Sequence, residues 1–190
     1  MSHEVAVEAI TLKVVPFQEH SHIITLFSKQ HGKICIACKK QKKIKREGFS
    51  PLLLVEAEVL MSEKQVWKSF SFEVIHSFAR LRTNLETLRH AAGAAQFLAN
   101  TLPMHAGVDE LYNDFHDYLK TLSFFDMPHV ASTAFLAKYC ALEGVLGTGN
   151  NLSSDELDVC EMLVEKPFQE LYGTVCEKAL LKKLVVVASR

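Results

Sequence analysis

The spacing of apolar residues changes once along the chain, near residue 80. Before that point, apolar and polar residues alternate in short runs rich in β-branched side chains, which is the period of β-strands. We expect five strands, over residues 5–15, 22–29, 32–39, 52–61 and 66–77, with a tight turn at 30–32. Five short strands with an early hairpin favour a small closed barrel. The OB-fold is the commonest five-stranded example, and the period alone does not separate it from an SH3-like barrel.

After residue 80 the apolar residues follow helical spacing. Thr83 and Glu86 have the spacing of a capping box, and the helix that they start is expected to end near Pro103. Further helices are expected over 109–122, from 126 to about 144, after Ser153, and from Pro167 to about residue 184. The pattern therefore predicts an α+β protein, with a five-stranded OB-fold nucleic-acid-binding domain over 1–80 and an all-helical domain over 81–190 for packing and partner docking.

The composition is that of an ordinary globular protein, with 48% hydrophobic and 23% charged residues in a chain of 190. No apolar run approaches the roughly 18 residues that a membrane helix needs. The N-terminus carries an early acid and a strand pattern, in contrast to a signal peptide. We therefore expect a cytoplasmic protein with no membrane partner.

A net charge of −1 conceals a strong charge asymmetry along the chain. Residues 29–46 contain eight cations and no acid, whereas residues 101–170 contain twelve acids and three lysines. Concentrated like charges repel one another, and a polyanion relieves that repulsion while it releases its own counterions. We favour a nucleic-acid contact for the basic stretch over the alternative of a solvated loop.

The candidate nucleic-acid contacts fall into three groups. The main phosphate-binding candidates are Lys29, Lys33, Lys39, Lys40, Lys42, Lys43, Lys45 and Arg46. Secondary candidates, which flank the predicted barrel in sequence, are Lys13, Arg80 and Arg82. Phe17 and Phe49 lie in turn or loop contexts, where aromatic rings can stack on bases.

Nothing in the sequence indicates catalysis or a cofactor. The chain lacks the glycine-rich phosphate-binding motifs and the nucleophile elbow of hydrolases. Cys35 and Cys38 have the spacing of a zinc knuckle, but no second such pair exists to complete four ligands. On a strand, positions 35 and 38 also point to opposite faces. We therefore predict a protein that is not an enzyme and binds neither metal nor cofactor.

The first hundred residues resemble the RecO family of recombination mediator proteins. EAITLKVVPFQEHSHIITLFSKQHGKICIACKK is similar to the family's first two strands, its His-Gly-Lys-Ile turn and the start of its basic loop. GFSPLLLVEAEV and FEVIHSFARLRTNLETLRHA resemble the fourth strand and the passage into the first helix. The resemblance is good over 8–100 and loose over 101–190. Its most specific part is the joint spacing of Glu8-Ala9-Ile10, Ile23–Phe27 and His31-Gly32-Lys33-Ile34.

This resemblance implies an OB-fold followed by a helical domain. It implies binding of single- and double-stranded DNA, annealing of complementary strands, and work with RecR to help RecA displace single-strand-binding protein from gapped DNA. It also implies that the helical domain holds the acidic tail of single-strand-binding protein in an apolar pocket. The acidic charge of 101–170 opposes that last contact unless Lys120, Lys138 or Arg89 provides a local positive pocket. Association with the nucleoid would follow.

Many members of that family carry a four-cysteine zinc loop in the helical domain. The equivalent segment here, GTGNNLSSDELDVCEMLVE, has one cysteine, so the resemblance is to a zinc-free, short version. Two other functions fit the same charge pattern, an RNA-binding OB-fold accessory protein and a protein-interaction adaptor whose basic loop binds an acidic protein. Strand annealing and recombinase loading in recombinational DNA repair remain the first hypothesis.

Overall fold

The computed structural model describes residues 3–39, 49–62, 65–147 and 152–189. The expected α+β class is confirmed, since five strands and five α-helices follow one another along these residues. The strands are β1 (His3–Phe17), β2 (Ser21–Ser28), β3 (Gly32–Lys39), β4 (Leu54–Met61) and β5 (Val66–His76). The helices are α1 (Leu85–Thr101), α2 (Asp109–Leu122), α3 (Pro128–Leu142), α4 (Ser154–Glu165) and α5 (Lys178–Ala188). Short 3₁₀ turns occupy Ala79–Arg82 and Phe168–Glu170.

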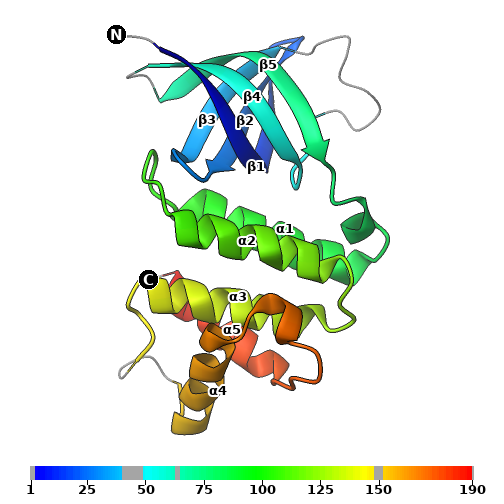
Figure 1. The fold of residues 1–190 in the computed structure, drawn as a ribbon, viewed down its shortest axis with the longest axis vertical. Helices are drawn as coiled ribbons and strands as arrows, with labels where there is room; N and C mark the ends of the chain where they lie inside the picture. The colour runs from blue at the N-terminus through cyan, green and yellow to red at the C-terminus, as the bar shows by residue number, and fades with distance from the viewer. Residues whose placement is uncertain (1–2, 40–48, 63–64, 148–151, 190) are drawn as a thin grey trace. The chain divides into compact units, whose positions relative to one another are not determined.

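The five strands form a closed barrel in the order β1-β2-β3-β5-β4 (Figure 1). β1 is long enough to pair with β2 through its C-terminal half and with β4 through its N-terminal half. All neighbouring strands are antiparallel except β3 and β5, which run parallel over three residue pairs from Cys35–Val66 to Ala37–Lys68. This parallel contact joins the two antiparallel groups of strands and closes the sheet.

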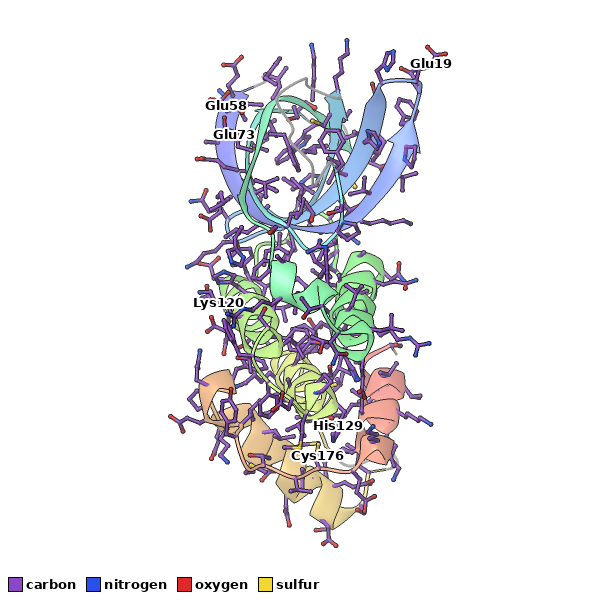
Figure 2. All side chains as sticks on the ribbon, turned by 90° about the vertical axis from the view of Figure 1, so that its right-hand side faces the viewer. Glu19, Glu58, Glu73, Lys120, His129 and Cys176 are labelled. Atoms are coloured by element: carbon purple, nitrogen blue, oxygen red, sulfur yellow. The ribbon has the colours of Figure 1, made fainter. Side chains whose placement is uncertain are left out.

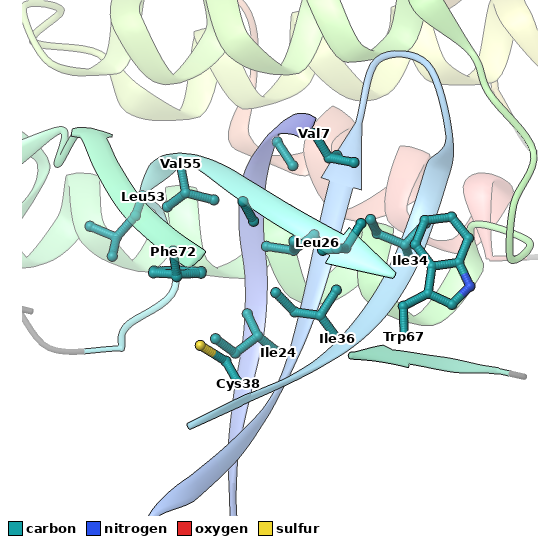
Figure 3. Packing of buried hydrophobic residues seen from close by; sticks show 13 residues of the cluster. Val7, Ile24, Leu26, Ile34, Ile36, Cys38, Leu53, Val55, Trp67 and Phe72 are labelled. Atoms are coloured by element: carbon teal, nitrogen blue, oxygen red, sulfur yellow. The ribbon is translucent and has the colours of Figure 1, made fainter. Parts of the chain in front are cut away.

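The barrel interior is filled by alternate residues of each strand. Ile34, Ile36 and Cys38 of β3 are at most 1% exposed, as are Ile24 and Leu26 of β2. Figure 3 shows these side chains converging with those of Val55, Trp67 and Phe72. Because successive side chains of a strand point to opposite faces, every residue between these positions faces away from the barrel interior.

A β-bulge in β1 changes which of its residues face outward. The pairing with β2 passes from Thr11–Leu26 to Lys13–Thr25, so Leu12 is the extra residue. Before the bulge Val7 and Ala9 are buried while Glu8 is exposed. After it the order is reversed, and Val14 packs against the core while Lys13 and Val15 are exposed. Bulges bend a strand and redirect its side chains.

The chain divides into two compact units that differ from a simple cut along the sequence. Residues 1–79 and 91–112 make up the first unit, and residues 80–90 and 113–190 make up the second. The first unit thus combines the barrel with most of α1 and the start of α2. The sequence suggests a boundary between residues 80 and 81 that separates a nucleic-acid-binding domain from a docking domain. This functional division remains a prediction.

Two expected helix starts are wrong. Thr83 does not cap α1, because its hydroxyl donates to the Arg80 carbonyl while Asn84 Oδ1 accepts from the Glu86 N–H at 2.8 Å. The last helix begins at Lys178 rather than near Pro167, since Gly173 takes a φ of +77° that a continuing helix excludes. The expected start after Ser153 is confirmed, with a full capping box between Ser153 and Glu156.

A buried hydroxyl links residues of α1, α2 and α3 that belong to the second unit. Ser132 Oγ on α3 donates to the Pro128 carbonyl at 2.9 Å. Having given its only proton, it accepts from the Tyr118 hydroxyl of α2 at 2.9 Å and from His90 Nδ1 of α1 at 2.8 Å. Burial lowers the pKa of His90, so the neutral ring suits this network.

In the first unit, the β2–β3 hairpin is held by the segment that follows α1. The His105 N–H donates to the Lys33 carbonyl at 2.9 Å, and Lys33 Nζ donates to the Ala99 carbonyl at 3.0 Å. Gly32 has a φ of +61°, and a Cβ there would lie 1.9 Å from the Ala106 carbonyl oxygen. Only glycine satisfies both the backbone angle and the close approach.

We therefore expect Gly32→Ala to destabilise the protein by about 2 kcal/mol or more, because the new methyl group displaces backbone. The matched control is Gly93→Ala in α1, where nothing lies within 4 Å of the added Cβ. That substitution should stabilise by about 0.5–1 kcal/mol, as alanine does in a helix interior. Urea denaturation measures both changes, and equal midpoints for the two variants would contradict the described hairpin contact.

Candidate nucleic-acid interface

The strand registers bring outward residues of β1, β2, β3 and β5 into continuous cross-strand rows. One row runs Lys13–Thr25–Cys35–Val66, and the next runs Val15–Ile23–Ala37–Lys68. A third row runs Phe17–Ser21–Lys39. We call these outward residues the lysine-bordered face, because ammonium groups stand at its margins and apolar side chains lie between them.

Three of the predicted contact residues meet on this face. Lys13, Phe17 and Lys39 are all exposed, and Phe17 and Lys39 belong to the same row. The bulge at Leu12 is the reason that Lys13 and Phe17 share an outward face with Val15. The face therefore offers both phosphate-binding ammonium groups and an aromatic ring, as nucleic-acid-binding barrels commonly do.

The sequence analysis missed the contribution of β5 to this face. Lys68 pairs with Ala37 across the parallel β3–β5 contact, which places its exposed side chain beside those of β3. Its ammonium lies 5.2 Å from the centroid of the Phe70 ring. Phe70 is the extra residue of a bulge, since the pairing with β4 passes from Ser69–Val59 to Ser71–Glu58. Sequence spacing carries no signal for a parallel contact between strands thirty residues apart.

Two of the predicted lysines lie elsewhere on the barrel. Lys29 is exposed next to the β2–β3 turn, at the opposite end of the hairpin from Lys39. Eight strand residues separate these ends, which corresponds to about 25 Å. Lys33 is half-buried, and its ammonium is used by the Ala99 carbonyl near the C-terminus of α1.

Phe49 is packed in a way that limits its use for stacking. It is half-buried against the barrel core, with ring centroids 4.8 Å from His22 and 5.2 Å from Phe72. Phe17 by contrast is 49% exposed. Of the two aromatic candidates, Phe17 therefore has the ring surface that a base could cover.

The remaining candidates lie in the second unit or beyond the described residues. Arg80 and Arg82 are exposed members of the second unit, and the Arg80 guanidinium lies 4.4 Å from the centroid of Phe124. Outside the described residues are Lys40, Lys42, Lys43, Lys45 and Arg46. The chain enters that segment from Lys39, on the lysine-bordered face, and leaves it at Phe49.

The outward surface of β4 and its neighbours carries the opposite charge. Glu8 pairs with Glu56, and Glu56 pairs with Glu73, so three exposed carboxylates stand in one row across β1, β4 and β5. Figure 2 labels Glu58 and Glu73 on this outer surface of the barrel. We call Glu8, Glu56 and Glu73 the glutamate row. Like charges directly opposite one another are destabilising, so this row costs stability and repels phosphates.

The cysteines follow the strand parity that the sequence indicates. Cys38 is buried in the barrel, whereas Cys35 is half-buried on the outer face, with Sγ 3.7 Å from Thr25 Oγ1. Burial raises the pKa of the buried thiols, to about 12 for Cys140 and about 11 for Cys160. Within the described ranges no group of three His, Cys, Asp or Glu side chains is placed to hold a metal ion.

One of the three residues considered for a positive pocket on the helices already has a partner within the helical unit. Lys138 Nζ donates to the Val164 carbonyl at the end of α4 and lies over the Phe168 ring. Its ammonium group is therefore engaged in contacts within the protein. Lys120 and Arg89 are exposed on α2 and α1. Across the described helices, none has the length and apolar character that a membrane crossing requires.

Comparison with known proteins gives a consistent result. Residues 1–78 match the family described as the N-terminal domain of recombination protein O. The chain is 32% identical over 108 residues to a "DNA repair protein RecO" of Thermodesulfovibrio yellowstonii, an alignment that covers 55% of this chain and 43% of that protein. It is 23% identical over 176 residues to the protein of the same name in Clostridium novyi, covering 90% and 67% of the two chains.

A third relative, "DNA repair protein RecO" of Geobacter sulfurreducens, is 26% identical over 123 residues, which cover 63% of this chain and 50% of the relative. The matches thus span between 43% and 67% of the length of these three relatives. The N-terminal match covers all five strands of the barrel, including those that form the lysine-bordered face. Over its N-terminal part the chain is thus similar to the RecO family.

Proposed function

We propose that this protein is a DNA-binding mediator of recombinational repair whose barrel is an OB-fold. In this proposal residues 1–80 bind single- and double-stranded DNA, and residues 81–190 pack as a helical domain that docks partner proteins. It anneals complementary strands and, with a RecR-like protein, helps to load a RecA-type recombinase on single-stranded DNA. It acts in the cytoplasm at the nucleoid and needs neither a metal nor another cofactor.

The observation that carries this proposal is the lysine-bordered face. Lys13, Lys39 and Lys68 supply exposed ammonium groups around an apolar centre, and the N-terminal family match covers every strand of this face. Phosphate contacts of this kind position a strand without reading its sequence, so we expect binding that is largely independent of sequence. The cations of 40–46 would extend the same surface from Lys39, and Lys29, Arg80 and Arg82 are secondary contacts.

Strand annealing follows from the same electrostatics. Two single strands repel one another through their phosphates, and ammonium groups that neutralise both strands lower this repulsion. A strand held at the surface also meets its complement at a raised local concentration. These effects need no reacting group, which agrees with a mediator rather than an enzyme.

A contact with the acidic tail of single-strand-binding protein is the least supported part of the proposal. Lys138 is already used within the helical unit, and the described helices carry many more acids than bases between 101 and 170. Contact with a RecR-like protein rests on the resemblance to the RecO family alone. Both partner contacts are therefore tested separately from DNA binding.

The salt dependence of DNA affinity tests the phosphate contacts. With five or six cations engaged, log K for a single-stranded oligonucleotide should fall with log salt at a slope of about −4. Replacing Lys39, Lys40, Lys42 and Lys43 together by glutamine should flatten the slope by about 3, since each lost contact removes about 0.7. Fluorescence anisotropy at several salt concentrations measures both slopes.

The matched control replaces two exposed helical lysines, Lys120→Gln and Lys182→Gln, and should leave the slope unchanged. If the fourfold substitution leaves the slope where it was, the segment after β3 is not the binding element. If both sets flatten it equally, binding is unspecific attraction by total charge.

An annealing assay tests the mediator function itself. Complementary oligonucleotides coated with single-strand-binding protein should anneal faster with the wild-type protein than without it, and the fourfold lysine variant should lose most of this acceleration. Naked oligonucleotides serve as the comparison. Acceleration on naked strands but not on coated ones would reject the contact with single-strand-binding protein and retain annealing, whereas no acceleration on either would reject the mediator role.

A further inference from the structure

Several large apolar side chains on the strands of the lysine-bordered face are exposed to water. Val15, Phe17 and Val66 are 43%, 49% and 39% exposed, and Phe70 is 43% exposed. All four lie on the strands of the lysine-bordered face. Exposed apolar side chains that gather on one surface and are surrounded by charged groups indicate a contact surface.

The registers place apolar residues of the middle row between the ammonium groups, while Phe17 and Val66 stand at two corners of the face. In the middle row, Val15, Ile23 and Ala37 lead across three strands to Lys68. Lys13 stands at one corner of the face, and Lys39 stands two rows away on β3. With strands about 4.8 Å apart and a rise of about 3.3 Å per residue, Lys13 and Lys39 are about 16 Å apart.

We propose that this apolar centre, with the exposed rings of Phe17 and Phe70 at its borders on β1 and β5, is a platform for unpaired bases, so that the protein distinguishes single strands from duplex. The proposal rests on the proposed DNA-binding function and adds to it the feature of DNA that the face recognises. Lys68 joins Lys13 and Lys39 as a phosphate contact of the bound strand.

Single-stranded and duplex DNA differ in whether their bases are accessible to such a surface. A single strand can turn its bases toward the protein, where each base has a flat π-face that stacks on an aromatic ring. In a duplex the bases are paired and stacked inside, and the backbone presents phosphates and sugars. Lysines attract both forms, whereas the apolar centre gains contact area from the single strand only.

The glutamate row would confine a bound DNA strand to the lysine-bordered face. On β1, Glu8 precedes the bulge and points to the acidic side, whereas Lys13 follows it and points to the basic side. Lys68 stands near the boundary, because its partner Leu60 on β4 is paired in turn with Glu4 on β1. A DNA strand that continued around the barrel past Lys68 would meet the carboxylates of the acidic side, which repel its phosphates.

The test compares affinities for a single-stranded oligonucleotide and its duplex in the same buffer. Phe17→Ala and Phe70→Ala should each weaken single-strand binding by about tenfold, the effect of losing one stacked base, and change duplex binding much less. Phe70→Tyr keeps the aromatic face and should bind like the wild type. Lys68→Gln should lower the single-strand salt slope by about 0.7.

The matched control is Ile75→Ala. Ile75 is 51% exposed and lies near the end of β5, the strand that carries Phe70. This substitution should leave both affinities unchanged, and thermal unfolding of every variant checks that the barrel remains folded. A side chain whose loss lowers single-strand affinity without lowering the melting temperature acts through the ligand.

The outcomes separate this inference from the function on which it rests. If the wild-type protein binds neither form of DNA, the proposed function fails. If it binds DNA but the phenylalanine variants bind as the wild type does, the apolar centre serves a protein contact instead and the platform is overturned. Equal losses for single strand and duplex would also overturn it, because the rings would then contribute through the fold and not through bases.

Discussion

The parallel contact between β3 and β5 is the constraint on which the rest of the first unit depends. It consists of three residue pairs, yet it closes a sheet whose other contacts are all antiparallel. Closure seals the interior, since Trp67 is paired with Ile36 and both are almost fully buried. The same contact carries Lys68 to the side of β3 and so widens the outer face from three strands to four. The core and the proposed binding surface therefore have a common structural origin.

Two bulges distribute charge and apolar surface around this barrel. In β1 the extra residue Leu12 exchanges the inward and outward positions, so glutamates face outward before it and Lys13, Val15 and Phe17 face outward after it. In β5 the extra residue is Phe70, whose exposed ring lies near the Lys68 ammonium. A barrel of regular strands would carry the same residues without this separation. The opposed carboxylates of the glutamate row cost stability. Under the proposed function this cost has a reason, because the separation of charge would repel phosphates from one side of the barrel and attract them to the other.

The hydrophobic period was sufficient to predict the α+β class, the five strands and the opposite orientations of Cys35 and Cys38. These features depend on residues that are close in sequence. The period could not show that Lys68 lies beside Ala37, because a parallel contact between distant strands leaves no local signal. It also could not show that the Lys33 ammonium is bound by the Ala99 carbonyl, which depends on where the chain returns after α1. Asn84 replaced Thr83 as the cap of α1, and Gly173 delayed the last helix, because one-residue competitions at helix ends are decided by local geometry.

The central claim, that a DNA strand covers the outward face of β1, β2, β3 and β5, can be tested on the unmodified chain. Cys35 lies within this face and is half-buried, whereas the other four cysteines are buried. Its alkylation by iodoacetamide, followed by mass spectrometry, therefore reports on the face itself. If the claim is right, a saturating single-stranded oligonucleotide slows alkylation of Cys35 by about tenfold or more, because stacked bases exclude the reagent. An unchanged rate, at a DNA concentration that anisotropy shows to be saturating, would place the strand elsewhere and contradict the account.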